Sequence, residues 1–162
     1  MIEVKKIPTN RWKDYRNLRL ETLKKDATAF GSSYEEERKL PELEWRRRTR
    51  NTLFALSNDK PIGMIAYVFN NKRKIKHVAN IFGFYVKESY RNQGIGKKLI
   101  ESALSSIMKN KKIVKIDLNV NPKQKSAVRL YKKFGFRIIG ILKKDLFVNG
   151  KFYDELTMEK FT

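Results

Sequence analysis

Apolar residues recur along this chain in two spacings, one typical of helices and one typical of strands. The helical spacing is clearest between Gly94 and Met108, where one face carries Ile95, Leu99, Ala103, Leu104 and Ile107. A continuous apolar run, Ile81 to Val86, precedes this helix and predicts a buried strand. A short polar turn joins the two segments. The pattern therefore predicts a strand, a turn and a helix in direct succession.

The same two spacings assign the rest of the chain. They predict strands at Ile2–Ile7, Thr52–Ser57, Ile62–Phe69, Ile75–Val86, Ile113–Val120, Phe136–Leu142 and Lys151–Phe161. They predict helices from Trp12 to about Lys25, in a short segment from Glu35, and over Glu42–Arg50, Gly94–Met108 and Gln124–Phe134. We expect an α/β fold with a mixed sheet of about seven strands and helices on both faces, its central pair parallel. No repeat or linker interrupts the chain, so we expect one domain, residues 1–162.

The turn after the central strand has the composition of an anion site. It reads Arg91-x-x-Gly94-x-Gly96 and opens a helix, where backbone N–H groups lack internal partners and the helix dipole favours negative charge. The glycines have no Cβ to block an approaching phosphate, and Arg91 and Lys97 add positive charge. The turn is neither a dinucleotide fingerprint, whose first glycine is missing, nor a P-loop. A tight turn without a ligand is the alternative interpretation.

A second segment of interest is the helix that ends near Gly135. Its apolar face carries Ala127, Leu130, Tyr131 and Phe134. Tyr131 is either a core aromatic side chain or one whose hydroxyl is placed for a partner, because a tyrosine on an apolar face usually keeps its hydroxyl hydrogen-bonded. The spacing alone does not separate these two interpretations.

Composition excludes several classes of site. The chain has no Cys and one His, His77, so disulfides, thiolate chemistry and His-rich metal sites are excluded, and we expect no metal. No apolar run has membrane-spanning length and no signal-peptide pattern opens the chain, so we expect a cytoplasmic protein that does not interact with membranes.

The charge of the chain is strongly positive. Lys and Arg number 37 and Asp and Glu 17, which gives a net charge of +20. Such a charge suits a polyanionic partner such as nucleic acid, or it is a scattered surface feature without a partner. We expect no nucleic-acid partner, because the basic patches do not interleave with aromatic residues and no basic recognition helix is present.

Together the two segments resemble the GNAT superfamily of acyl-coenzyme A-dependent N-acyltransferases. Arg91, Gly94 and Gly96 are similar to its pyrophosphate-binding signature. Ala127, Leu130, Tyr131, Gly135 and Phe136 are similar to its late Ala-x-x-Leu-Tyr-x-x-x-Gly-Phe helix. The resemblance extends over the whole chain and implies a three-layer fold of about seven mostly antiparallel strands with a central parallel pair.

The resemblance also implies a function and roles for individual residues. It implies an N-acetyltransferase that moves an acetyl group from acetyl-coenzyme A to a primary amine, of a small molecule or a peptide, by direct attack. Tyr131 would protonate the departing thiolate. The cofactor-binding residues would be Phe84, Tyr85, Val86, Arg91, Asn92, Gln93, Gly94, Ile95, Gly96, Lys97, Asn119 and Gln124. Gln124 stands where many members of the family carry Asn. The loop from Ala29 to Tyr34 is similar to the acceptor-side loop of the family, and implies acceptor contacts by Phe30, Tyr34 and Glu36.

The sequence does not identify the general base or the amine acceptor. The strand Ile81–Val86 lacks the carboxylate that some members of the family carry, so we expect ordered water to take the amine proton, with Glu35, Glu36, Glu37 and Asp154 as other candidates. A polyamine acceptor would be repelled by the net charge unless Glu35–Glu37 line the site. A noncatalytic acyl-coenzyme A sensor and a nucleic-acid-binding module are the alternatives to the enzyme. Homodimers are common in the family, so a homodimer is a further option.

Overall fold

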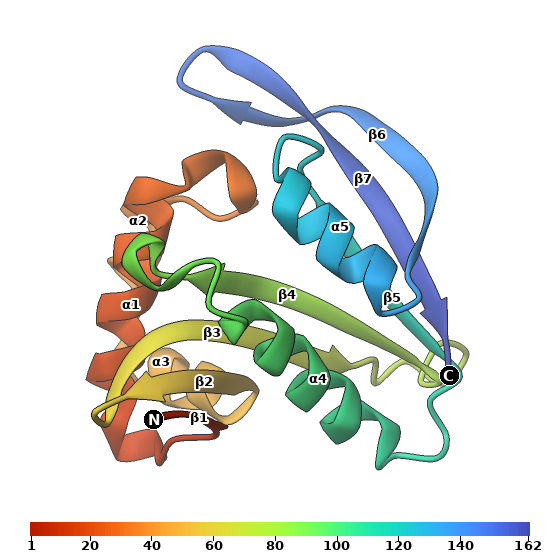
Figure 1. Cartoon of the computed structure of the whole chain (residues 1–162). Helices are drawn as coiled ribbons and strands as arrows, with labels where there is room; N and C mark the ends of the chain where they lie inside the picture. The colour runs from red at the N-terminus through yellow and green to blue at the C-terminus, as the bar shows by residue number, and fades with distance from the viewer.

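The computed structural model describes residues 1–162, folded around one seven-stranded sheet (Figure 1). The strands are β1 (Ile2–Lys5), β2 (Thr52–Ser57), β3 (Lys60–Phe69), β4 (Val78–Val86), β5 (Lys115–Val120), β6 (Arg137–Val148) and β7 (Lys151–Phe161). The helices are α1 (Trp12–Lys25), α2 (Tyr34–Glu37), α3 (Glu42–Arg50), α4 (Ile95–Met108) and α5 (Lys125–Lys133), with 3-10 turns η1 (Thr9–Arg11), η2 (Ala27–Ala29) and η3 (Glu88–Tyr90).

The order of strands in the sheet is β1-β2-β3-β4-β5-β7-β6. Every neighbouring pair is antiparallel except β4 and β5, which run parallel and are joined through α4. This arrangement confirms the mixed sheet and the central parallel pair that the sequence predicts. None of the helices is both long and apolar enough to cross a membrane.

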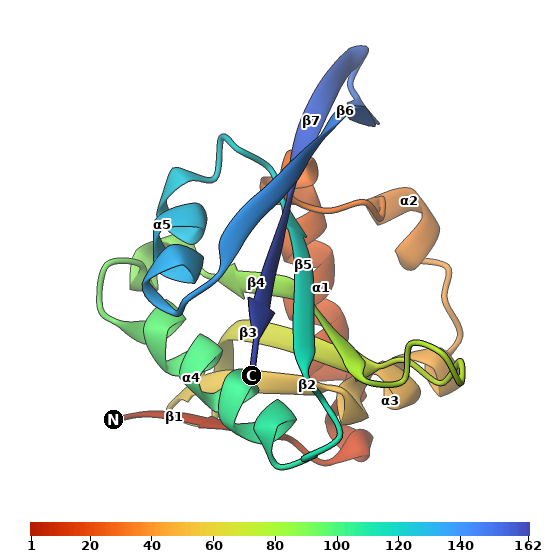
Figure 2. The ribbon, with the colours of Figure 1, turned by 90° about the vertical axis from the view of Figure 1, so that its right-hand side faces the viewer.

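Helices cover both faces of the sheet, as Figure 2 shows with α4 and α5 on one side and α1 to α3 on the other. The larger core packs the apolar face of α4, including Leu99, Ala103 and Ile107, against the sheet. In the smaller core, the ring of Tyr15 of α1 makes edge-to-face contacts with Trp45 of α3 and with Phe54 of β2, each at 5.5 Å between ring centres. Burying apolar area on both faces is what stabilises this three-layer arrangement.

The parallel strands separate soon after they meet. Their ladder contains only the pairs Val78–Lys115, Ala79–Ile116 and Asn80–Asp117, although β4 continues to Val86 and β5 to Val120. A β-bulge at this point, with Gly83 at φ +63°, increases the bend of β4. The result is a widened gap between two central strands, with a helix N-terminus at its edge.

Two predicted strands differ from the observed strands by three residues or more at one end. The strand expected from Ile75 begins at Val78, because the preceding residues form turns closed by Ile75 N–H to Lys72 O and Val78 N–H to Ile75 O. The strand expected to end at Leu142 continues to Val148, because pairing with β7 resumes at Leu146 after an irregularity and the turn Asn149-Gly150 joins the two strands. Both residues of that turn have positive φ, as the sequence Asn-Gly favours.

Candidate active site

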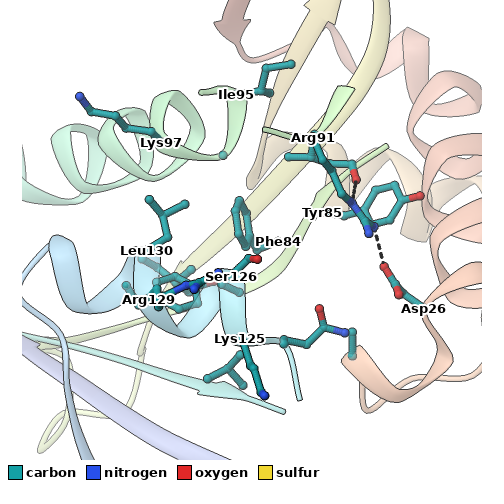
Figure 3. Close-up of a pocket in the computed structure, with 18 of the residues that line it drawn as sticks. Asp26, Phe84, Tyr85, Arg91, Ile95, Lys97, Lys125, Ser126, Arg129 and Leu130 are labelled. Atoms are coloured by element: carbon teal, nitrogen blue, oxygen red, sulfur yellow. Dashed lines mark hydrogen bonds and ion pairs between the residues drawn. The ribbon is translucent and has the colours of Figure 1, made fainter. Parts of the chain in front are cut away.

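A cavity of about 700 Å³ occupies the widened gap between β4 and β5 (Figure 3). Its wall combines the end of β4, the turn before α4, the end of β5 and one face of α5. The sequence-predicted residues in this wall are Phe30, Phe84, Tyr85, Val86, Arg91, Asn92, Gly94, Ile95, Gly96, Lys97, Asn119, Gln124 and Tyr131. Gln93 is not in the wall, and its side-chain amide instead donates to Ser89 O.

The turn at the edge of the cavity presents a row of free backbone donors. The N–H groups of the six consecutive residues 92–97 donate to no acceptor in the protein, and Lys98 N–H to Gly94 O is the first bond of the helix. No side chain caps α4 and no acidic residue lies in its first turn. Six unpartnered donors at the positive end of a helix dipole form a site that can bind a phosphate or diphosphate.

The two glycines of this turn have different roles. Gly94 has φ +75° and no heavy atom within 4 Å of where a Cβ would stand, so it supplies both the turn and open access. A Cβ on Gly96 would lie 3.1 Å from the Phe84 ring and 3.2 Å from Leu130. Gly96 therefore serves the close packing of α4 on β4 and α5, which differs from the open approach that the sequence suggested for both glycines.

Arg91 holds the turn in place and does not point its charge at the free donors. Its Nε donates to Val86 O at 2.9 Å and its Nη2 donates to Asp26 at 2.9 Å, as Figure 3 shows. The guanidinium also lies 5.7 Å from the centre of the Tyr85 ring. Lys97 Nζ is 3.7 Å from Glu101. The charge that the sequence assigned to these two residues is thus partly compensated by carboxylates.

Further basic side chains, which the sequence interpretation missed, also line the cavity. They come from α5 and the turn before it: Lys123, Lys125, Arg129 and Lys133. Figure 3 labels Lys125 and Arg129 on α5, beside the gap. The basic spacing of this helix was visible in the sequence, but only the fold brings it opposite the turn before α4. Part of the net positive charge of the chain is therefore located in the cavity wall.

Tyr131 is a buried residue of the cavity wall. It is 4% exposed, and its ring packs 5.8 Å from Phe84 and 5.6 Å from Phe136 between ring centres. Its hydroxyl forms no hydrogen bond with another group of the protein, and burial raises the pKa of the phenol well above its ordinary value. The side chain is therefore both a core residue and a neutral hydrogen-bond donor facing the cavity.

Comparison with known proteins agrees with this geometry. Residues 12–136 match the protein-family model described as the acetyltransferase (GNAT) family. The chain belongs to the GNAT family. It is 27% identical to the L-amino acid N-acetyltransferase AaaT of Escherichia coli (strain K12) over 67% of this chain and 66% of that protein. It is 32% identical to the uncharacterized N-acetyltransferase YokL of Bacillus subtilis (strain 168) over 65% of this chain and 60% of that protein.

These two matches span slightly less than two thirds of the relatives' own length. Solved structures extend the likeness to the whole fold. A GNAT acetyltransferase from Streptococcus pneumoniae superimposes with a TM-score of 0.87 at 21% identity over 99% of both chains. The yncA protein of Salmonella typhimurium, solved with acetyl-CoA, has a TM-score of 0.82 at 11% identity over 99% of this chain and 94% of that one.

Within this GNAT fold, two predicted acceptor residues lie outside the cavity. Glu36 forms a capping box at α2, accepting from Ser33 N–H and Oγ, and Tyr34 stacks under Lys24 Nζ at 4.3 Å. Phe30 does line the cavity. The geometry thus brings one of the three predicted acceptor residues to the site.

The carboxylates considered as bases are engaged elsewhere. Glu37 is buried and accepts from Arg19, Glu35 accepts from Arg38, and Asp154 accepts from Lys143 and the Lys144 N–H. None of them lines the cavity of the GNAT fold. No group of three or more His, Cys, Asp or Glu side chains is arranged to hold a metal ion.

One residue beside this site had no signal in the sequence beyond a turn. Asn121 is 1% exposed just after the end of β5, and its side-chain amide donates to Thr28 O of η2 at 3.0 Å. Its Oδ1 accepts from Lys123 N–H at 2.9 Å. Asn121 therefore fastens the segment before Phe30 to the strand that forms the opposite side of the gap.

Proposed function

We propose that this protein transfers the acetyl group of acetyl-coenzyme A to a primary amine, by direct attack of the amine within a ternary complex. The observation that carries the proposal is the row of free N–H groups at residues 92–97, placed at the edge of a gap between parallel strands. A diphosphate satisfies these donors, and the gap accommodates an extended amide-bearing arm. The residues present therefore fit the cosubstrate.

The individual contacts follow from this fit. The N–H groups of residues 92–97 hold the diphosphate, and the cations of α5, including Lys125 and Arg129, lie near enough to the cavity to add charge. The backbone of Phe84 and Val86 along the open edge of β4 holds the arm. Because Val86 O accepts from Arg91 in this structure, we place the first contacts on Phe84.

The reaction needs a neutral amine and a stabilised leaving group. Acetyl-coenzyme A supplies the acetyl thioester. A C–N bond forms as the C–S bond breaks, the amine gives up one proton and the sulfur gains one. An amine of pKa about 10.4 costs roughly 4–5 kcal/mol to deprotonate at pH 7. Because no candidate base reaches the cavity, water receives this proton, as expected from the sequence.

Tyr131 is the residue that we place at the sulfur. Burial keeps its phenol protonated because the pKa is raised, so it acts as a hydrogen-bond donor and not as a base. A phenol of raised pKa is a weak acid beside a thiolate of pKa about 8.5, so we assign Tyr131 to orient and stabilise the leaving sulfur by a hydrogen bond. Water supplies the proton that the sulfur gains.

Relatives support a primary amine as the acceptor and differ in its kind. They include an L-amino acid N-acetyltransferase, a spermine/spermidine N(1)-acetyltransferase of Bacillus subtilis, and the structure of a ribosomal-protein-alanine N-acetyltransferase from Brucella melitensis. The spermine/spermidine enzyme is 32% identical over 36% of this chain. A small-molecule or peptide amine is consistent with all three.

The experiment that tests the proposed function is release of free thiol from acetyl-coenzyme A in the presence of a panel of amines. We expect amine-dependent thiol release. Binding of coenzyme A without thiol release from any amine would favour a noncatalytic sensor. Steeply salt-dependent binding of nucleic acid in a filter assay, with no affinity for coenzyme A, would favour the nucleic-acid-binding module.

We further propose that the protein is a homodimer. The edge strand β6 is exposed along most of its length, and its apolar side chains Ile139 and Ile141 are about half exposed, at 47% and 53%. An uncovered apolar edge strand is a surface that another chain can pair with. Sedimentation velocity of the protein checks this, with a single monomer species as the contradicting result. The cytoplasmic location stays a prediction.

A further inference from the structure

A second chamber lies against the first, at the point where the parallel strands part. It has a volume of about 340 Å³ and shares six wall residues with the larger cavity: Ala29, Phe30, Ile81, Phe82, Gly83 and Asn119. Asn80 and Asp117, the last paired residues of β4 and β5, also line it. An acceptor that reaches the acetyl group from this side of the gap would rest in this chamber.

The chamber contains a carboxylate that no cation of the protein neutralises. Glu155 of β7 is 8% exposed, and it takes part in no hydrogen bond or ion pair with a basic side chain. Its acidic neighbour is Asp145 of β6. Burial first, and then the charge of Asp145, raises the pKa of the Glu155 carboxyl. A hydrogen bond with the Asp145 carboxyl raises this pKa further but brings no positive charge, so a ligand cation would be the first to neutralise the pair.

A second carboxylate, Asp117 of β5, lines the chamber farther along the sheet, opposite Glu159. Asp117 Oδ1 is buried and forms an ion pair with Lys115 Nζ at 3.2 Å. Lys115 is shared with Glu159, whose carboxylate also accepts from Arg137. Asp117 and Glu159 thus both lie within ion-pair distance of Lys115, whereas Glu155 has no basic side chain as a partner.

We propose that this chamber holds the distal ammonium group of an aliphatic diamine or polyamine, with Glu155 as its ion-pair partner. The inference rests on the proposed function and names its acceptor. Glu155 lines the second chamber only, and Tyr131 lines the first only. The carboxylate is therefore set back from the reacting end, as a group that binds the far end of the acceptor must be.

The sequence pointed to Glu35–Glu37 as the acids that would line a polyamine site. In the structure these three residues are engaged with other groups. Glu35 and Glu36 are engaged on the surface of α2, and Glu37 is bonded to Arg19 and Arg48. The carboxylates of the chamber come from β5 and β7 instead. The net charge of +20 does not prevent binding, because exposed charges beyond about 8 Å are screened at physiological ionic strength.

The chamber suits a free amino acid less well. An α-carboxylate would need a cation, and the only basic residue in this wall is Arg19. Its Nε and Nη2 both donate to Glu37 at 2.9 Å. The α-carboxylate would also face Glu155 across the same small space, and two carboxylates in one site repel each other.

The experiment compares a four-carbon diamine (diaminobutane) with butylamine, the monoamine of equal length. We expect the wild-type protein to have the higher kcat/KM for the diamine. Glu155→Gln should raise KM for the diamine by about 10- to 100-fold, because a charge-assisted contact is lost. It should leave kcat for the diamine, both constants for butylamine and KM for acetyl-coenzyme A within about twofold. Calorimetric titration of the diamine into protein saturated with coenzyme A should show the same loss of affinity without turnover.

Asp154→Asn is the matched control, because it removes one charge from the adjacent residue of β7 outside the chamber. It should leave the diamine constants unchanged. Equal losses for diamine and butylamine in Glu155→Gln would overturn the proposal, as would a wild-type preference for L-amino acids or for a lysine-bearing peptide. In each of those cases thiol release still supports the transferase. Absence of thiol release with every amine would instead reject the proposed function itself.

Discussion

Asn80 and Asp117 are the last residues to pair between the parallel strands β4 and β5, and both face the chamber that opens beyond them. The strands diverge from this pair, so backbone that would otherwise complete a ladder is left facing a cavity. The turn before α4 adds its free N–H groups at the same opening. One break in strand pairing thus creates both the cosubstrate side and the acceptor side of the site.

Replacing Tyr131 by Phe should separate packing from catalysis. The ring contacts with Phe84 and Phe136 remain, and only the hydroxyl facing the cavity is lost. We expect kcat to fall by about 10²-fold or more, as for loss of a positioned hydrogen-bond donor that stabilises developing charge, with KM for acetyl-coenzyme A within about twofold. Steady-state thiol-release kinetics measure both constants.

Tyr67→Phe is the control for this variant, because Tyr67 is another buried core tyrosine that does not line the cavity. It should leave kcat unchanged. An unchanged kcat in Tyr131→Phe would assign Tyr131 to the core alone.

The buried carboxylate of Glu37 should be a major source of stability. It is 3% exposed and accepts two hydrogen bonds from Arg19, with Arg48 Nη1 at 3.1 Å. Glu37→Gln leaves buried guanidinium charge uncompensated, so we expect a loss of about 3–5 kcal/mol in the free energy of unfolding. Glu42→Gln, which removes one partner of the exposed pair with Arg46, should cost less than about 1 kcal/mol. Urea denaturation at pH 7 measures both, and equal costs would contradict the prediction.

Acidification should reduce the stability that the Glu37 carboxylate provides. Burial alone would raise the pKa of Glu37, but the hydrogen bond and charge of Arg19, with the charge of Arg48, outweigh it and lower the pKa. A carboxyl whose pKa is lower in the folded state stabilises above the unfolded pKa, near 4.3, and this stability is lost as pH falls through the folded pKa. We therefore expect the difference in unfolding free energy between wild type and Glu37→Gln to narrow below about pH 4. A constant difference from pH 7 to pH 3 would contradict this.

Local sequence patterns were sufficient for the central part of the fold. The run Ile81–Val86, the turn at Gly94 and the apolar face of α4 each depend on neighbours in the chain, and the structure has all three. Tyr131 entered the prediction through its place on the apolar face of α5 and through family resemblance. These features follow from the spacing of apolar residues and from the residue types found in turns, both of which can be read from a single sequence.

Long-range neighbours account for what the sequence did not predict. Gly96 is needed because Phe84 and Leu130, from two other elements, close on it. Glu155 looks like a surface charge in the sequence, and becomes a buried one only because β7 lies between β5 and β6. No local pattern reports which strand is inserted at that place in the sheet.

Asn121 gives a further test of such a long-range contact. Asn121→Ala removes the bond to Thr28 O, from a residue 93 positions away, and the bond from Lys123 N–H. Because Thr28 O and Lys123 N–H each lose a partly buried hydrogen bond, we expect a loss of about 1–3 kcal/mol in unfolding free energy. The Ala29 amide, which donates to Asp26 O, should exchange its hydrogen faster.

Asn110→Ala provides the comparison, because Asn110 Oδ1 accepts from Lys112 N–H in an exposed turn of the same kind. Its cost should stay below about 0.5 kcal/mol. Similar costs for the two variants, or unchanged exchange at Ala29, would show that the contact with Thr28 does not hold the segment.

The most direct measurement of the central claim is calorimetric titration of coenzyme A into wild type, Gly94→Glu and Gly150→Glu. Both glycines have similar positive φ, at 75° and 77°, with no heavy atom within 4 Å of where a Cβ would stand, so backbone strain and added charge are matched. Only Gly94 stands among the free N–H groups. We predict binding by wild type and Gly150→Glu, and a loss of at least about tenfold in affinity for Gly94→Glu. No binding by wild type at millimolar coenzyme A, or equal affinities in all three proteins, would contradict the account.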